Sequence, residues 1–191
     1  MRRPGRKAAL LAGLAAEQGA ADGPGERQPH QAGLVRRALA GAPGATGVVV
    51  ADGTRPPWAP GTFDRVLVDA PSPGSAPCGG VRSPGGGGVG GPDRAGALQR
   101  ALLASAADLV RPGGVLLYAT CSPVLAETAE VVSEVLADRP DLVLEDVTAA
   151  LPGVPDCAGP LPGTAQLWPH RHGTDAMFLA QLRRSEPFAG T

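Results

Sequence analysis

Three segments of the chain place a reactive or acidic residue where a short apolar run ends. Cys121 closes the run 115–122, which follows an Arg-Pro-Gly-Gly turn, while Asp52 and Asp69 follow two shorter runs. Apolar runs of this length between turn signals are typical of buried parallel strands. The carboxyl ends of such strands meet at one edge of an open α/β sheet, where ligands bind. A thiol there can act as a nucleophile, and carboxylates there can bind a ligand or move a proton. The structural alternatives are a small buried thiol for Cys121 and strand-end caps for the two aspartates.

Alternating helical and strand patterns must position these side chains. We expect helices over residues 8–18, 29–40, 92–110 and 124–137, and strands over 46–51, 63–68, 115–122, 142–147 and 177–182. This alternation predicts an α/β fold with a mostly parallel, doubly wound sheet and helices on both faces. Residues 72–91, which are nearly all Ser, Pro and Gly, are expected to form a disordered loop.

The composition predicts one domain, which we place over residues 1–185, followed by a tail at 186–191. A chain of 191 residues with 43% hydrophobic content can bury one core. The net charge of −1 argues against a large basic surface but allows local basic patches. Three widely spaced cysteines form neither a disulfide framework nor a metal-binding pattern, which favours the cytoplasm. The apolar stretch near the N-terminus is short and interrupted by Glu17, so we expect neither a membrane span nor a signal peptide.

The motifs around the strand ends resemble one protein family. They are Asp69-Ala70-Pro71, Arg111-Pro112-Gly113-Gly114, Tyr118-Ala119-Thr120-Cys121-Ser122, Thr54-Arg55-Pro56-Pro57-Trp58 and the closing segment from Pro169 to Asp175. With these motifs the chain resembles the bacterial RsmB/Sun-type RNA (cytosine-5) methyltransferases. The resemblance implies a Rossmann-like class I methyltransferase fold, S-adenosylmethionine as cofactor, and rRNA or tRNA as substrate.

The resemblance also implies a role for each matched residue. Cys121 matches the nucleophile that adds to carbon 6 of cytosine, which makes carbon 5 nucleophilic enough to accept a methyl group. Asp69 matches the carboxylate that contacts the base and favours a protonated N3. Asp52 matches the residue that binds the adenine amino group of the cofactor, and Glu26 the residue that binds its ribose hydroxyls. A plain solvated carboxylate remains an equal alternative for Glu26.

The N-terminal segment matches only the tail of the family's glycine-rich cofactor loop. This match implies that Pro4, Gly5 and Lys7 lie beside the methionine part of S-adenosylmethionine, although Lys7 has the same solvated alternative as Glu26. The strand and the loop residues that the family has before Pro4 are not matched, so the first strand and half of the cofactor cradle are expected to be missing.

Two further departures lie after Asp69. Ser72-Pro73-Gly74 stands where the family has Cys-Ser-Gly, whose cysteine helps to remove the carbon-5 proton, and a serine hydroxyl is far less acidic than a thiol. Residues 75–91 replace an arginine-rich, Trp-containing segment that supplies cationic RNA contacts. GC-rich codons for residues 76–90, read in the neighbouring frame, give Gly-Ala-Leu-Arg-Arg-Arg-Pro-Glu-Ser-Arg-Trp-Arg-Arg-Arg. We therefore hypothesise that this stretch lies between two compensating frameshifts, which resequencing of the gene tests.

The leading interpretation is a monomeric, metal-independent RNA (cytosine-5) methyltransferase with weak cofactor binding and a Cys121–RNA adduct that accumulates. The first alternative is an inactive fragment or pseudo-enzyme of the same family. A methyltransferase of this fold acting on a small molecule or protein is disfavoured, because such reactions need no carbon-6 nucleophile. His170 and His172 are expected either to contact RNA phosphate or to stabilise a turn, and Cys78 and Cys157 to be incidental thiols.

Overall fold

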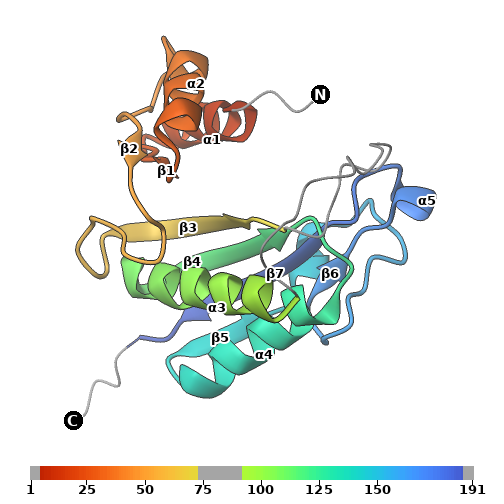
Figure 1. The fold of residues 1–191 in the computed structure, drawn as a ribbon. Helices are drawn as coiled ribbons and strands as arrows, with labels where there is room; N and C mark the ends of the chain where they lie inside the picture. Colours follow the sequence, from red (N-terminus) through yellow and green to blue (C-terminus); the bar gives the residue numbers. More distant parts are fainter. Residues whose placement is uncertain (1–4, 73–91, 187–191) are drawn as a thin grey trace, which may run out of the picture. The chain divides into compact units, whose positions relative to one another are not determined.

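The computed structural model describes residues 5–72 and 92–186, in two compact units that span Met1–Pro57 and Trp58–Thr191 (Figure 1). Pro4, Cys78, the predicted loop from residue 73 onward with its frameshift segment 76–90, and the predicted tail from residue 187 onward lie outside the described residues. None of the described helices is both long enough and apolar enough to cross a membrane.

The smaller unit contains two helices and two very short strands, drawn in red and orange in Figure 1. Its elements are α1 (Arg6–Glu17), β1 (Gly25–Glu26), α2 (Pro29–Leu39) and β2 (Val49–Val50). The two predicted helices are confirmed, whereas the strand predicted over 46–51 is reduced to two residues. β1, which pairs in parallel with β2, lies in a glycine-rich stretch without strand character. Proline at the first helical position explains the start of α2.

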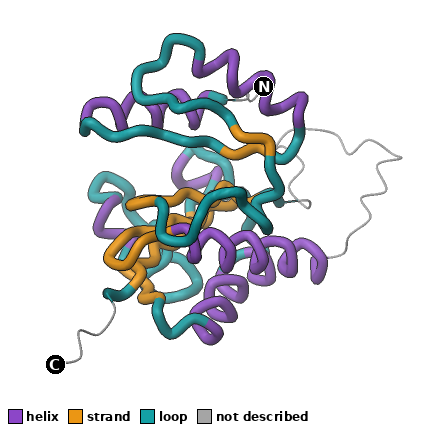
Figure 2. Tube along the Cα trace, turned by 90° about the vertical axis from the view of Figure 1, so that its left-hand side faces the viewer, coloured by secondary structure: helices purple, strands orange, loops and turns teal. Residues whose placement is uncertain are grey.

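The larger unit is an α/β unit with one five-stranded sheet. Its elements are β3 (Phe63–Ala70), α3 (Pro92–Leu109), β4 (Val110–Thr120), the 3₁₀ helix η1 (Leu125–Glu127), α4 (Ala129–Asp138), β5 (Leu142–Glu145), the 3₁₀ helix η2 (Val147–Ala150), β6 (Ala165–Gln166), α5 (Pro169–His172) and β7 (Phe178–Arg184). Figure 2 distinguishes helices, in purple, from strands, in orange. The short β6 and α5 were not expected from the sequence.

Four strands of the larger unit run in one direction, and one runs in the opposite direction. The order is β3-β4-β7-β5, with β6 also pairing with β7. β3 and β4 are parallel, while β7 is antiparallel to β4, β5 and β6. The sheet of the described residues is therefore mostly parallel in strand direction, as expected, but mixed, because β7 runs opposite to the other strands. Within this unit, the two long helices α3 and α4 pack against each other beside the sheet (Figure 1).

The predicted Arg-Pro-Gly-Gly turn is an irregularity inside β4 instead of a turn before it. Phe63 pairs with Val110 but Arg65 pairs with Val115, so four residues of β4 lie opposite a single residue of β3. Gly113 has a φ of 76°, a left-handed conformation that glycine adopts without a steric cost. From Val115 onward the pairing is regular up to Thr120, so that Cys121 is the first residue after the strand.

The predicted helix over residues 124–137 is divided at Thr128. Residues 125–127 form η1, and α4 begins at Ala129. Thr128 Oγ1 donates a hydrogen bond to the carbonyl of Val124, a side-chain-to-backbone bond of the kind that competes with regular helix geometry. Because of this division, Glu127 belongs to η1 and not to the continuous helix that the sequence pattern predicts.

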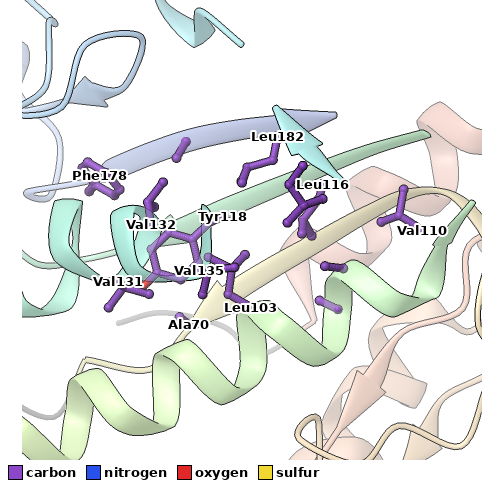
Figure 3. Packing of buried hydrophobic residues seen from close by; sticks show 14 residues of the cluster. Ala70, Leu103, Val110, Leu116, Tyr118, Val131, Val132, Val135, Phe178 and Leu182 are labelled. Carbon is purple, nitrogen blue, oxygen red and sulfur yellow. The ribbon is translucent and has the colours of Figure 1, made fainter. Parts of the chain in front are cut away.

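The core of the larger unit lies between the sheet and the helices α3 and α4. Figure 3 shows Tyr118 from β4 beside Val131 and Val132 of α4, with Leu103 of α3 below them. Tyr118 also meets Phe178 of β7 edge to face, with ring centroids 6.2 Å apart. These contacts pack the carboxyl end of β4 against β7 and against the helices α3 and α4.

Candidate active site

Cys121 lies at the carboxyl edge of the sheet, immediately after β4. Its side chain is half-buried, and its Sγ lies 2.9 Å from Sδ of Met177, just before β7. The residues on both sides of it are fixed: Thr120 is fully buried, and Ser122 Oγ accepts a hydrogen bond of 3.1 Å from the backbone N–H of Val124. A partly accessible thiol on such a rigid strand end is well placed to act as a nucleophile.

Asp69 lies on the strand next to Cys121, at the same edge. In the parallel ladder, Asp69 pairs with Ala119 and Ala70 with Thr120, the last pair before Cys121. Adjacent strands lie about 4.8 Å apart, so the two side chains flank one small region. Asp69 is exposed and belongs to β3 itself, which extends two residues beyond the predicted strand. The structure thus brings Cys121 and Asp69 together as expected, while their catalytic roles stay predictions.

The segment after Asp69 is hydrogen-bonded to Gln99 of α3. The Gln99 side chain is fully buried, and its Nε2 donates a hydrogen bond of 2.9 Å to the carbonyl of Pro71. Its Oε1 is buried and has no hydrogen-bond partner among the residues that the structure describes. The sequence offers no signal for this contact, because a polar residue on a helix is ordinarily assigned to the solvent face.

Ser72 is held by a second buried polar residue, Glu127 of η1. Ser72 Oγ donates a hydrogen bond of 2.5 Å to Oε2 of Glu127, whose side chain is only 3% exposed. The hydroxyl of Tyr118 donates 2.8 Å to the backbone carbonyl of Glu127. Burial, and then the negative charge of Glu127, raise the pKa of Tyr118, so its hydroxyl remains a donor. Sequence reasoning also missed Glu127.

Glu26 and Asp52 lie together in the smaller unit. Glu26 pairs with Val50 in the parallel ladder, so Asp52 follows the carboxyl end of the strand beside Glu26. Asp52 Oδ1 accepts hydrogen bonds from the backbone N–H and the hydroxyl of Thr54. These bonds, and then the charges of Arg27 and Arg55, lower the pKa of Asp52. The Glu26 Oε1 accepts from the backbone N–H of Gln28 and thereby supports the start of α2.

The two carboxylates are suitable for binding S-adenosylmethionine. The second oxygen of each one, Oε2 of Glu26 and Oδ2 of Asp52, accepts no hydrogen bond from the described residues. Carboxylate oxygens at the carboxyl end of parallel strands are acceptors of the kind that ribose hydroxyls and an adenine amino group need. The carboxylate acceptors of this unit therefore fit the nucleoside part of the cofactor.

Gly5 and Lys7 begin α1 in the same unit. Gly5 has a φ of 86°, and a Cβ at this position would lie 2.6 Å from Cβ of Ala38, so Gly5 packs closely on α2. Lys7 is exposed in the first turn of the helix. Pro4, the third residue of this predicted group, lies outside the described residues. The contact of this segment with the methionine part stays a prediction.

The histidine segment is explained by local structure. Nδ1 of His172 accepts a hydrogen bond from the backbone N–H of Trp168, so Nε2 carries the proton and donates to the carbonyl of Pro155. His170 lies beside the ring of Trp168. The turn-stabilising alternative therefore holds for His172. Among residues 5–72 and 92–186, no group of three or more His, Cys, Asp or Glu side chains is arranged to hold a metal ion.

The fold is that of the Rossmann-like, S-adenosylmethionine-dependent methyltransferases. A methyltransferase homologue from Pyrococcus horikoshii has a TM-score of 0.72 to the chain, over 95% of this chain and 59% of that protein, at 22% identity. NSun6 from the same organism, solved with SFG, has a TM-score of 0.71 over 98% of this chain and 47% of its own, at 21% identity. At these identities the likeness concerns the fold alone.

Sequence comparison relates part of the chain to one protein family. Residues 93–183 match the model for the 16S rRNA methyltransferases RsmB/F. A putative methyltransferase of Mycobacterium tuberculosis (strain H37Rv) is 53% identical over 88 residues, which are 46% of this chain and 19% of that protein. The mitochondrial tRNA (cytosine(34)-C(5))-methyltransferase of Danio rerio is 48% identical over 50 residues, 26% of this chain and 14% of its own. Over residues 93–183 the chain is therefore similar to the RsmB/F methyltransferases, as its motifs predict, and its matches span at most about a fifth of these relatives.

Proposed function

We propose that the protein methylates carbon 5 of a cytosine in rRNA or tRNA, with Cys121 as the nucleophile. The observation that carries the proposal is the position of the Cys121 thiol: it is half-buried, at the carboxyl edge, and beside Asp69 on the neighbouring parallel strand. The names of two matched relatives add support, since one denotes a small-subunit rRNA methyltransferase of Bacillus subtilis and the other a tRNA cytosine-C5 methyltransferase.

The proposed reaction begins when the Cys121 thiolate forms a bond to carbon 6 of the cytosine. The electron pair of the C5–C6 double bond moves toward carbon 5, and Asp69 stabilises the charge that develops at N3 by donating or sharing a proton. S-adenosylmethionine, when bound, would supply the methyl group that carbon 5 accepts; its bond from sulfur to that methyl group breaks, which leaves S-adenosylhomocysteine. The carbon-5 proton then leaves, the double bond re-forms, and the C6–S bond breaks with its electrons returning to Cys121.

A covalent-adduct assay tests this proposal. The chain is incubated with labelled small-subunit rRNA transcript, tRNA and S-adenosylmethionine, and the products are separated on a denaturing gel. We expect a retarded protein–RNA band that disappears in Cys121→Ala. Cys157→Ala is the matched control, because this thiol is buried at 6% exposure. A band of equal intensity in the wild-type protein and Cys121→Ala contradicts the role of Cys121.

An inactive member of the family is the second candidate, and the serine at position 72 favours it, since the family cysteine at this position is replaced. Calorimetry with S-adenosylmethionine separates the two candidates. Measurable binding together with a Cys121-dependent adduct favours the enzyme, whereas the absence of both heat and thermal shift favours the inactive member.

A further inference from the structure

Glu127 is a buried carboxylate in contact with a hydroxyl at the candidate active site. Its side chain is 3% exposed, and its Oε2 accepts the hydrogen bond of 2.5 Å from Ser72 Oγ. A buried carboxylate is costly unless hydrogen bonds compensate for the water that it loses. A charge-assisted bond of this length is strong, and it directs the hydroxyl proton of Ser72 toward Glu127.

Three contacts with other elements fix the position of Glu127. Tyr118 donates its hydroxyl to the Glu127 carbonyl, and η1 packs against α3 at Gly96. A Cβ on Gly96 would lie 2.6 Å from the carbonyl oxygen of Ala126, so only glycine allows this close approach. Ser122, which follows Cys121, leads into η1 through its bond to the backbone of Val124. The elements that carry Cys121, Ser72 and Glu127 are therefore packed against one another at one edge.

We propose that Glu127 is a positioning residue for product release, and that its carboxylate accepts the Ser72 hydroxyl proton while Ser72 Oγ removes the proton from carbon 5. This inference rests on the proposed function. In this step the C5–H bond breaks and its electron pair forms the C5–C6 double bond. The C6–S bond breaks, and its pair returns to Cys121 as thiolate. The carbon-5 proton ends on Ser72, and the original hydroxyl proton ends on Glu127.

The chemistry explains why serine needs such a partner at this position. A serine hydroxyl alone is a weak base, whereas a carboxylate at hydrogen-bond distance can take its proton in the same step. Ser72 is also suitably located, because it comes two residues after Ala70, which pairs with Thr120 beside Cys121. With Glu127 in place, the Cys121–RNA adduct forms to a detectable level and is then released at a measurable rate, so that it does not remain a dead end.

The test measures how fast the Cys121–RNA adduct disappears after excess unlabelled RNA is added to protein, labelled RNA and S-adenosylmethionine. Glu127→Gln keeps the size and the hydrogen-bond acceptor but cannot take a proton. We expect this variant, like Ser72→Ala, to lengthen the adduct half-life at least about tenfold. This factor is smaller than the rate acceleration that general-base catalysis often contributes. Glu130→Gln, an exposed acid three residues away, is the matched control and leaves the half-life unchanged.

The same measurement in a Ser72→Cys protein shows whether Glu127 accepts a proton or has only a structural role. In Ser72→Cys the thiol is acidic enough to act by itself, so adding Glu127→Gln is expected to change release less than twofold. Equal slowing in the serine and cysteine backgrounds shows a structural role and overturns the inference, as does an unchanged half-life in Glu127→Gln. Both outcomes leave the proposed function standing. If the wild-type protein forms no Cys121-dependent adduct, the proposed function fails together with the inference.

Discussion

The Sγ atom of Cys121 lies 2.9 Å from the Sδ atom of Met177, so that a thioether acts as acceptor for the candidate nucleophile. Met177 immediately precedes β7, the strand that pairs with β4. The thiolate is the reactive form of cysteine, and a thiol loses the proton of such a contact when it reacts. We therefore expect the contact with Met177 to slow the reactions of Cys121.

Met177→Leu removes this acceptor while keeping a similar volume. We expect alkylation of Cys121 by iodoacetamide to accelerate roughly threefold, which corresponds to the loss of one weak hydrogen bond. Mass spectrometry of the Cys121 peptide, in a protein whose Cys78 is replaced by serine, measures the rate. Buried Cys157 serves as an internal reference. A slower reaction in Met177→Leu contradicts this view of the contact.

Gly96→Ala is expected to destabilise the larger unit. The added Cβ would lie 2.6 Å from the Ala126 carbonyl oxygen, so α3 and η1 must separate at a cost of about 1–3 kcal/mol. Urea denaturation followed by circular dichroism measures the loss. The control is Gly33→Ala within α2, where a Cβ meets nothing within 4 Å and alanine stabilises a helix by about 0.5–1 kcal/mol. A neutral Gly96→Ala contradicts the predicted close approach.

Glu26→Gln is expected to weaken the binding of S-adenosylmethionine. The amide oxygen still accepts from the backbone of Gln28, so the start of α2 is preserved, but the charge offered to the ribose hydroxyls is lost. Hydrogen bonds to charged groups contribute about 1.5–3 kcal/mol, so affinity should fall by roughly ten- to a hundredfold in calorimetry. Glu17→Gln, at the exposed end of α1, is the control. Equal affinities for the two variants exclude Glu26 from the cofactor site.

The pair of Arg139 and Asp141 makes the larger unit sensitive to acid. The Arg139 side chain donates two hydrogen bonds to Asp141, and these, with the charges of Arg139 and Arg184, lower the pKa of Asp141. A lowered carboxyl pKa stabilises the fold above the unfolded value of about 3.9, and this stabilisation disappears as the pH falls through the lowered value.

Arg139→Gln should reduce the unfolding free energy at pH 7 by about 1 kcal/mol or less, because the pair is partly exposed, and the difference should vanish toward pH 2. Urea denaturation at a series of pH values measures both quantities. Arg100→Gln, which removes the more exposed pair with Glu134, is the control with a smaller effect at pH 7. A difference between Arg139→Gln and wild type that persists at low pH contradicts this assignment.

Local pattern determined most of the helices and the position of the strand ends. The helices at Arg6–Glu17, Pro29–Leu39 and Pro92–Leu109 match their predicted ranges, because amphipathic spacing and a proline start are properties of the local sequence. The placement of Asp69 and Cys121 at one edge also followed from the sequence, since parallel strands end together. The motifs predicted the similarity to the RsmB/F methyltransferases independently of the fold.

Tertiary structure decided which polar residues support the site. Glu127 lies where a continuous helix was predicted, but the chain is divided at Thr128 and Glu127 belongs to η1. In this position its carboxylate accepts the hydrogen bond from Ser72. Gln99 contacts Pro71 because α3 packs under the end of β3, a relationship between residues 28 positions apart. The sequence by itself thus determined most of the elements and the candidate reactive residues, through short-range periodicity and motif. Only the packed structure assigned hydrogen-bond partners to the buried polar groups, because those partners are distant in the chain and burial makes their pairing obligatory.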